Sequence, residues 1–134
     1  MALPLLVCAG VVCRGGRYLL ATRPPGSRLA GRWEFPGGKV VDGESLVDCI
    51  RRELCEELGL SVGAVAPLDV VEFPEAEPPL RLHFLTCALE ATAEPVAHEG
   101  QRVGWFTLTE LQSLDLLPAD RLFVERLVGR HPQP

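Results

Sequence analysis

The stretch GKVVDGESLVDCIRRELCEELGL, residues 38–60, decides how this chain folds and contains a predicted helix with a cluster of glutamates. Over residues 45–58 apolar side chains recur every three or four positions, which is the periodicity of an α-helix with one buried face. Gly59 follows as a suitable C-terminal stop. Three glutamates of this helix lie three and four positions apart: Glu53, Glu56 and Glu57. This spacing places them on one arc at the edge of the apolar stripe.

The glutamate arc needs compensation by positive charge. Like charges within one helical turn repel each other, and the C-terminal end of the helix dipole disfavours anions further. Arg51 and Arg52 supply part of the compensation but point to other sides of the helix. Ligands that are all oxygen suit Mg²⁺ or Mn²⁺ rather than zinc. The alternative is an acidic helix face in water, so the helix alone leaves metal binding open.

Residues 38–60 resemble the Nudix box, G-x5-E-x7-R-E-U-x-E-E-x-G-U, in which U is a bulky aliphatic residue. All of its specified positions are filled: Gly38, Glu44, Arg52, Glu53, Leu54, Glu56, Glu57, Gly59 and Leu60. The resemblance implies an α/β protein with the Nudix fold, a mixed β-sheet sandwiched between α-helices. It also implies hydrolysis of the pyrophosphate linkage of a nucleoside polyphosphate, with Mg²⁺ as cofactor and Mn²⁺ as an alternative ion.

The resemblance assigns roles to single residues of this sequence. The implied metal ligands are Gly38 through its carbonyl, Glu53, Glu56, Glu57 and, from a later loop, Glu99. The implied catalytic residues are Glu44, Arg52 and Glu53. Glu53 is the best candidate for the base that takes a proton from water. Arg52 can meet Glu44, which precedes the helix, and can hold Glu53 in position.

The likeness extends beyond the box to nearly the whole chain. RWEFPGG, residues 32–38, is similar to the approach to the box in MutT-type proteins, which convert a nucleoside triphosphate to a monophosphate and pyrophosphate. HEGQ, residues 98–101, followed by Trp105, resembles a loop that brings a further glutamate to the metals in that branch. Glu99 is therefore a candidate ligand, with a plain loop carboxylate as the alternative. Arg23 matches a position that contacts the nucleotide, with a solvated loop arginine as the alternative.

Three further residues are candidates for substrate binding. Arg81 lies on a predicted strand, and Phe35 can either stack on a base or belong to the core. Asp120 stands where MutT proteins that select 8-oxo-guanine have asparagine. An ionised aspartate only accepts hydrogen bonds, so it suits the amino group of cytosine better than O6 of guanine. A protonated Asp120 would regain a donor, and an Asp120 that only caps the final helix would not contact the base.

The segment LPAD, residues 117–120, resembles the CTP pyrophosphohydrolases. We therefore predict a Mg²⁺-dependent nucleoside triphosphate pyrophosphohydrolase that acts on CTP, dCTP or modified pyrimidine forms, with 8-oxo-dGTP as the next candidate. A dinucleotide or ADP-ribose pyrophosphatase is disfavoured because those branches usually carry extra sequence. A non-catalytic Nudix module that binds nucleotides is disfavoured because such modules tend to lose box carboxylates.

Length, composition and charge indicate the number of domains, the kind of partner and the location of the protein. A chain of 134 residues with 47% hydrophobic residues is expected to form one domain, residues 1–134. The net charge of −5 argues against a nucleic acid polymer as partner but not against a small nucleoside triphosphate, whether the protein is a monomer or a homodimer. The apolar N-terminus is short and lacks a basic leader, so we expect a buried strand, no membrane span and a cytoplasmic protein. The five cysteines are predicted to be reduced core thiols.

Shorter patterns predict the remaining elements. The predicted strands or extended segments are 5–13, 18–22, 34–38, 65–73, 80–89 and 103–108, and a final helix spans about 118–128. Strands on both sides of one central helix, followed by a terminal helix, indicate a mixed sheet between helices.

Overall fold

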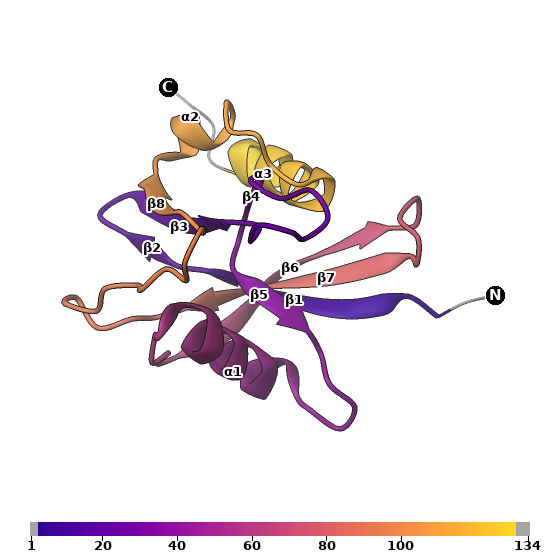
Figure 1. Ribbon diagram of the computed structural model, residues 1–134, viewed down its shortest axis with the longest axis horizontal. Coiled ribbons are helices and arrows are strands. Elements are labelled where there is room, and N and C mark those ends of the chain that lie inside the picture. The colour runs from indigo at the N-terminus through magenta and orange to yellow at the C-terminus, as the bar shows by residue number, and fades with distance from the viewer. Residues whose placement is uncertain (1–2, 131–134) are drawn as a thin grey trace.

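The computed structural model describes residues 3–130. The strands are β1 (Leu5–Val11), β2 (Cys13–Arg14), β3 (Arg17–Thr22), β4 (Trp33–Glu34), β5 (Gly37–Lys39), β6 (Val65–Phe73), β7 (Leu80–Cys87) and β8 (Val103–Phe106). The helices are α1 (Leu46–Leu58), α2 (Leu108–Leu111) and α3 (Pro118–Arg130). Figure 1 shows α1 on one side of the strands and α3 on the other.

The first sheet has the order β5-β1-β7-β6 and is mixed. β1 runs parallel to β7, whereas β5 and β6 are antiparallel to their neighbours. Parallel neighbours need a long crossover connection, and the chain between β1 and β7 contains α1. The pairing of β1 with β5 places Gly38 opposite Cys8. The glycine-rich start of the segment that resembles the Nudix box is therefore fixed to the sheet.

The second sheet is built around β3, which pairs antiparallel with β2, β4 and β8. β4 puts Glu34 opposite Ala21, close to where β3 ends. A parallel bridge between Trp33 and Leu116 ties this sheet to the segment that precedes α3. Residues far apart in the sequence thus meet at the end of β3.

Helix α1 has defined signals at both ends. The Oγ of Ser45 accepts a hydrogen bond from the backbone N–H of Asp48 at 3.0 Å, which is N-terminal capping. Gly59 adopts the left-handed conformation with φ of 66°, which glycine tolerates best. The buried face consists of Cys49, Ile50, Leu54 and Leu58. These features confirm the predicted helix over residues 45–58 and its stop at Gly59.

Alternate residues of the strands face opposite sides of the sheets and form two apolar clusters. The cluster that includes residues of α1 contains Cys8, Leu19, Ile50, Leu54 and Leu85. The cluster that includes residues of α3 contains Ala9, Leu20, Phe35, Phe84 and Phe123. Helices cover both faces of the strands, which confirms the predicted α/β fold with a mixed sheet between helices. Within residues 3–130, no helix is both long and apolar enough to cross a bilayer.

The structure corrects several details of the predicted elements. The strands form two sheets rather than one, and the predicted strand 5–13 ends at Val11 before a separate β2 begins. β7 and β8 each end two residues before the predicted end. α2 was not predicted, because four residues are too few for a periodic pattern.

The prediction that all cysteines lie in the core is wrong for two of the five. Cys8, Cys49 and Cys87 are buried, whereas Cys13 and Cys55 are exposed, and all five are free thiols. Cys55 follows the buried Leu54, and one step along a helix turns the side chain by about 100°, away from the core. An apolar neighbour in the sequence therefore does not bring a helical cysteine into the interior.

Candidate active site

Arg52 is the centre of the polar network on α1. Its Nε donates to Glu44 Oε2 at 2.8 Å. Its Nη1 donates to Glu53 Oε1 at 2.9 Å and to Glu56 Oε2 at 3.3 Å. Hydrogen bonding to Arg52 lowers the pKa of Glu44 to about 2, and the same contacts raise the pKa of Arg52. The structure thus brings together the three predicted catalytic residues.

Gly38 lies directly against the carboxylate of Glu53. A Cβ atom at position 38 would come 2.3 Å from Cδ of Glu53, so a larger residue would push this carboxylate out of its observed position. The side chain of Glu53 is 19% exposed and is bounded by Arg52 and by the backbone of Gly38. The carboxylate is therefore held at the junction of α1 and β5.

Glu57 turns towards a different partner. Its Oε1 accepts a hydrogen bond from Gln101 Nε2 at 3.3 Å. Burial raises the pKa of Glu57. The sequence predicted no role for Gln101 beyond its place in the HEGQ motif, because an uncharged amide in a loop gives little signal.

Glu99 lies in the loop between β7 and β8 and is exposed. The neighbouring His98 donates from Nε2 to the backbone oxygen of Glu56 at 2.9 Å, which joins this loop to the last turn of α1. The loop therefore lies against the helix that carries the other glutamates. The ligand role of Glu99 stays a prediction.

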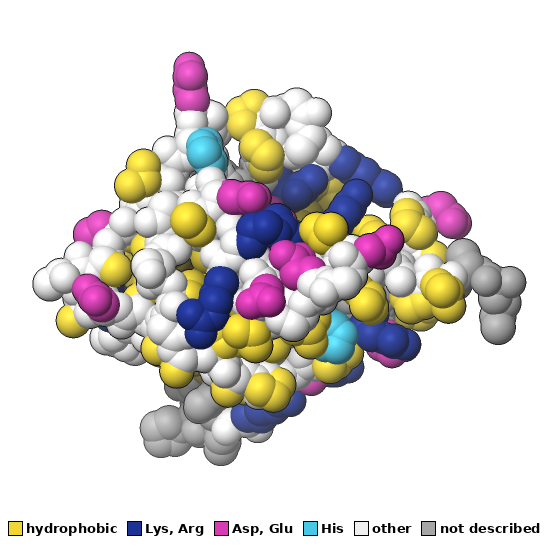
Figure 2. All heavy atoms as spheres, turned by 90° about the horizontal axis from the view of Figure 1, so that it is seen from below, with side chains coloured by type: hydrophobic (Ala, Val, Ile, Leu, Met, Phe, Trp, Pro, Cys, Tyr) yellow, Lys and Arg dark blue, Asp and Glu magenta, His cyan; other side chains and the backbone are white. Residues whose placement is uncertain are grey.

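The donor chemistry of this region fits a hard divalent cation, since it offers carboxylate oxygens and the carbonyl of Gly38. Figure 2 shows acidic and basic side chains side by side on the face that carries α1. Across the described range 3–130, however, no three His, Cys, Asp or Glu side chains converge closely enough to hold a metal ion. Arg52 engages Glu53 and Glu56, while Glu57 turns to Gln101. Ligation by the predicted set would require these side chains to rotate, so the set stays a prediction.

Asp120 lies in the first turn of α3 and is 2% exposed. Its Oδ1 accepts a hydrogen bond from the backbone N–H of Phe35 at 2.9 Å, so it does more than cap its own helix. Burial raises the pKa of Asp120 to about 7.

Glu34 and Arg23 lie beside Asp120. Arg23 Nη1 is 3.6 Å from Glu34 Oε2. Burial, followed by the charge of Asp120, raises the pKa of Glu34 to about 8. The structure therefore brings together two predicted substrate-binding residues, Arg23 and Asp120, and adds Glu34. Only the position of Glu34 inside the run RWEFPGG could have pointed to it.

Two other predicted substrate-binding residues have different surroundings. Phe35 is 2% exposed and packs edge to face against Phe84 and Phe123, with ring centroids 5.9 and 5.2 Å away. Its ring lies in the apolar cluster with Phe84 and Phe123, so the core alternative describes Phe35 in this structure. Arg81 Nε donates to Glu72 Oε1 at 2.8 Å across β6 and β7. No hydrogen bond or ion pair within residues 3–130 joins Arg81 to the glutamates of α1.

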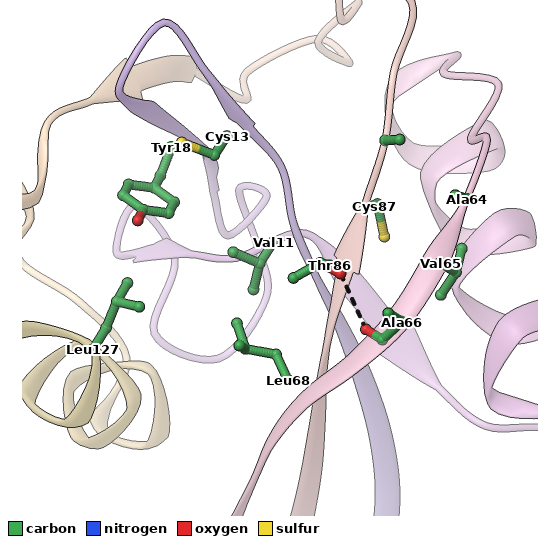
Figure 3. Close-up of a pocket in the computed structure, with 11 residues that line it drawn as sticks. Val11, Cys13, Tyr18, Ala64, Val65, Ala66, Leu68, Thr86, Cys87 and Leu127 are labelled. Carbon is green, nitrogen blue, oxygen red and sulfur yellow. Dashed lines mark hydrogen bonds between the residues drawn. The ribbon is translucent and has the colours of Figure 1, made fainter. Parts of the chain in front are cut away.

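A cavity of about 430 Å³ lies between the two sheets and α3, with Val11, Leu68 and Leu127 in its wall (Figure 3). Its lining contains no charged side chain and none of the predicted site residues. A nucleoside triphosphate carries several negative charges, so this apolar cavity is not where it would be hydrolysed. The polar region around Arg52 is the candidate active site.

The fold and this site define the class of the protein. The model of the NUDIX domain family matches residues 4–127, so the chain belongs to the Nudix family. It is a Nudix nucleotide diphosphatase, a hydrolase that acts on acid anhydrides of small nucleotides. Enzymes of this family generally use divalent metal ions.

Two sequence relatives and one solved structure show which Nudix proteins this chain is similar to. A Mycobacterium tuberculosis protein named "Putative 8-oxo-dGTP diphosphatase 2" is 39% identical over 128 residues, covering 91% of this chain and 86% of that protein. The CTP pyrophosphohydrolase of Escherichia coli is 36% identical over 124 residues, covering 92% and 90%. The solution structure of the E. coli ORF135 protein superposes with a TM-score of 0.79 at 34% identity, covering 96% and 91%.

Proposed function

We propose that this chain is a nucleoside triphosphate pyrophosphohydrolase, which converts a nucleoside triphosphate and water to a monophosphate and pyrophosphate. The proposed cofactor is Mg²⁺, with Mn²⁺ as an alternative ion. The observation that carries the proposal is the network in which Arg52 holds Glu44 and Glu53, with Glu53 against Gly38. The presence of all box carboxylates disfavours a non-catalytic module.

In the proposed mechanism Glu53 takes the proton from the attacking water. Arg52 fixes the direction of this carboxylate, and Glu44 fixes Arg52 from the opposite side. The residues that would hold the cation are Gly38, Glu53, Glu56, Glu57 and Glu99. When bound, the divalent cation neutralises phosphate charge and stabilises the charge that develops at the attacked phosphorus.

Asp120 is the proposed reader of the base. Its ionised form only accepts hydrogen bonds and suits the amino group of cytosine, which favours CTP or dCTP. Because burial raises the pKa of Asp120 to about 7, a protonated form that can also donate exists near neutral pH. That form suits 8-oxo-guanine, so 8-oxo-dGTP is the second candidate. The names of the two relatives above support the same pair of substrates.

Arg23 is the proposed contact to the rest of the nucleotide. Its guanidinium is partly exposed and only 3.6 Å from Glu34, a long separation for an ion pair. A phosphate oxygen could therefore compete with Glu34 for Arg23. Phe35 and Arg81 are not part of this proposal.

The test is a panel of nucleotides in which pyrophosphate release is measured between about pH 6 and about pH 8. We expect CTP or dCTP to be hydrolysed fastest and the ratio of 8-oxo-dGTP to CTP turnover to fall as Asp120 ionises. Asp120→Asn should raise that ratio and remove its pH dependence, since asparagine does not titrate. If 8-oxo-dGTP were hydrolysed faster than CTP and dCTP at every pH, 8-oxo-dGTP would become the proposed substrate. Nucleotide binding without any pyrophosphate release would contradict the proposed reaction.

A further inference from the structure

Gln101 joins three parts of the molecule through one buried amide. The residue is 9% exposed, and its Nε2 donates both to the backbone oxygen of Thr22 at 2.9 Å and to Glu57 Oε1 at 3.3 Å. Thr22 ends β3, and Glu57 lies in the last turn of α1. The Gln101 side chain therefore connects the second sheet, its own loop and one of the box glutamates.

The direction of this amide is fixed by its neighbours. Rotating it by half a turn would put Oε1 against the Thr22 carbonyl and the Glu57 carboxylate, which are both acceptors. In the observed direction, Oε1 is buried and has no hydrogen-bond partner among residues 3–130. A buried unpaired acceptor is unfavourable, so the two bonds made by Nε2 decide the orientation. Gln101 thus acts as a donor directed at Glu57.

The loop that carries Gln101 is attached to the same helical turn at two more points. The backbone N–H of Val96 donates to the oxygen of Leu58 at 2.9 Å. His98 Nε2 donates to the oxygen of Glu56, also at 2.9 Å. The last carbonyls of a helix have no partner within the helix, so these two bonds satisfy groups that α1 leaves free. The loop is therefore built onto the turn that presents Glu56 and Glu57.

We propose that Gln101 is a positioning residue that sets the direction of the Glu57 carboxylate towards a divalent cation. The inference rests on the proposed function, in which Glu57 is a metal ligand. Groups that hydrogen-bond to metal ligands fix the orientation of those ligands, and their loss typically weakens metal affinity about 10- to 100-fold. Gln101 is the only described side chain that donates a hydrogen bond to Glu57 within residues 3–130.

The test measures Mn²⁺ affinity in the full-length protein, without nucleotide, by the electron paramagnetic resonance signal of free Mn²⁺. The variants are Gln101→Met, which keeps the length of the side chain but removes the amide, Glu57→Gln, and the double variant. Gln112→Met is the matched control, because the Gln112 side chain is exposed and bonds only to the backbone oxygen of Leu108 in α2. Circular dichroism verifies folding. If Gln101→Met is unfolded, Gln101→Asn replaces it, since the shorter side chain cannot reach both acceptors.

We expect Gln101→Met to weaken Mn²⁺ binding about tenfold and Gln112→Met to leave it unchanged. In the Glu57→Gln background, the change at Gln101 should have no further effect, because the residue acts through Glu57. Wild-type affinity in folded Gln101→Met, or two effects that multiply in the double variant, would overturn the inference while leaving the proposed function intact. Wild-type affinity in Glu57→Gln would instead overturn the ligand role of Glu57 and the inference with it.

Discussion

Arg52 shows how much of the site depends on one side chain. Its guanidinium donates to three carboxylates, those of Glu44, Glu53 and Glu56. A planar guanidinium presents several donors in fixed directions, which a lysine ammonium does not. The box glutamates can therefore stay close together on α1 without strong mutual repulsion, and Glu53 is held against Gly38.

The proposed base is tested by Glu53→Gln. Glutamine keeps the oxygen that accepts from Arg52 but cannot take up a proton, so the fold should persist. We expect pyrophosphate release to drop by about 10²- to 10⁴-fold, with an unchanged circular dichroism spectrum. Glu125→Gln, an exposed site on α3, is the control and should keep wild-type turnover. Turnover at the wild-type rate in Glu53→Gln would show that another group is the base.

Helix α3 is attached to the first sheet by a largely buried aspartate. The side chain of Asp69 on β6 is 11% exposed, and its Oδ1 lies 3.2 Å from Arg126 Nη1. Its Oδ2 lies 3.2 Å from Arg130 Nη2, which is an ion pair without the angles of a hydrogen bond. Both arginines belong to α3, so Asp69 orients the helix that also carries Asp120.

Loss of this contact should weaken the docking of α3. We expect Asp69→Asn to lower the free energy of unfolding by about 1 kcal/mol, because it removes the charge that both arginines share. The matched control is Glu72→Gln on the same strand, whose pair with Arg81 is exposed and should contribute less than about 0.5 kcal/mol. Urea denaturation of the three proteins measures the difference. Equal stability of both variants would mean that the charge of Asp69 contributes nothing to the docking of α3.

On the scale of the whole molecule, folding withdraws two neighbouring acidic side chains from water, Asp120 fully and Glu34 in large part, with 19% of the Glu34 side chain still exposed. The pKa of Asp120 rises to about 7 from an ordinary value of 3.8, and that of Glu34 rises to about 8 from 4.5. A group with a raised pKa in the folded state adds stability that is fully present below its unfolded pKa. That stability is lost as the pH rises through the folded pKa. Ionisation of these two groups should therefore weaken the fold between about pH 4 and about pH 8.

Asp120→Asn tests this dependence on pH. Asparagine keeps an acceptor for the N–H of Phe35 but carries no charge at any pH. We expect the variant to be more stable than the wild type at about pH 8, by on the order of 1–3 kcal/mol. Between about pH 5 and about pH 8, the variant should also lose less stability than the wild type does. Urea unfolding at both pH values measures the effect, with Asp42→Asn on the surface as control. If the free energy of unfolding of Asp120→Asn depended on pH as in the wild type, ionisation of Asp120 would not be what weakens the fold.

The elements of the fold could be predicted where a local pattern is long enough. The predicted strand 65–73 and the helix over residues 45–58 agree with the structure, because apolar periodicity and end signals are properties of neighbouring residues. The division into two sheets could not be predicted in this way. It depends on β3 pairing with β8, which lies about eighty residues further along the chain. Short elements such as α2 also gave no pattern to detect.

By itself the sequence determined the family, helix α1 and the spacing of Glu44, Arg52 and Glu53. Fixed spacing along one helix and the loop before it is visible in the sequence, without knowledge of how the helix packs. Only the tertiary structure showed that Phe35 is a core residue, that Gln101 reaches Glu57, and that Asp120 and Glu34 share a buried region. The physical reason is that burial and long-range hydrogen bonds arise when separate strands and helices pack together. They set the pKa of a carboxyl group and the direction of an amide, and neither can be read from neighbours in the chain.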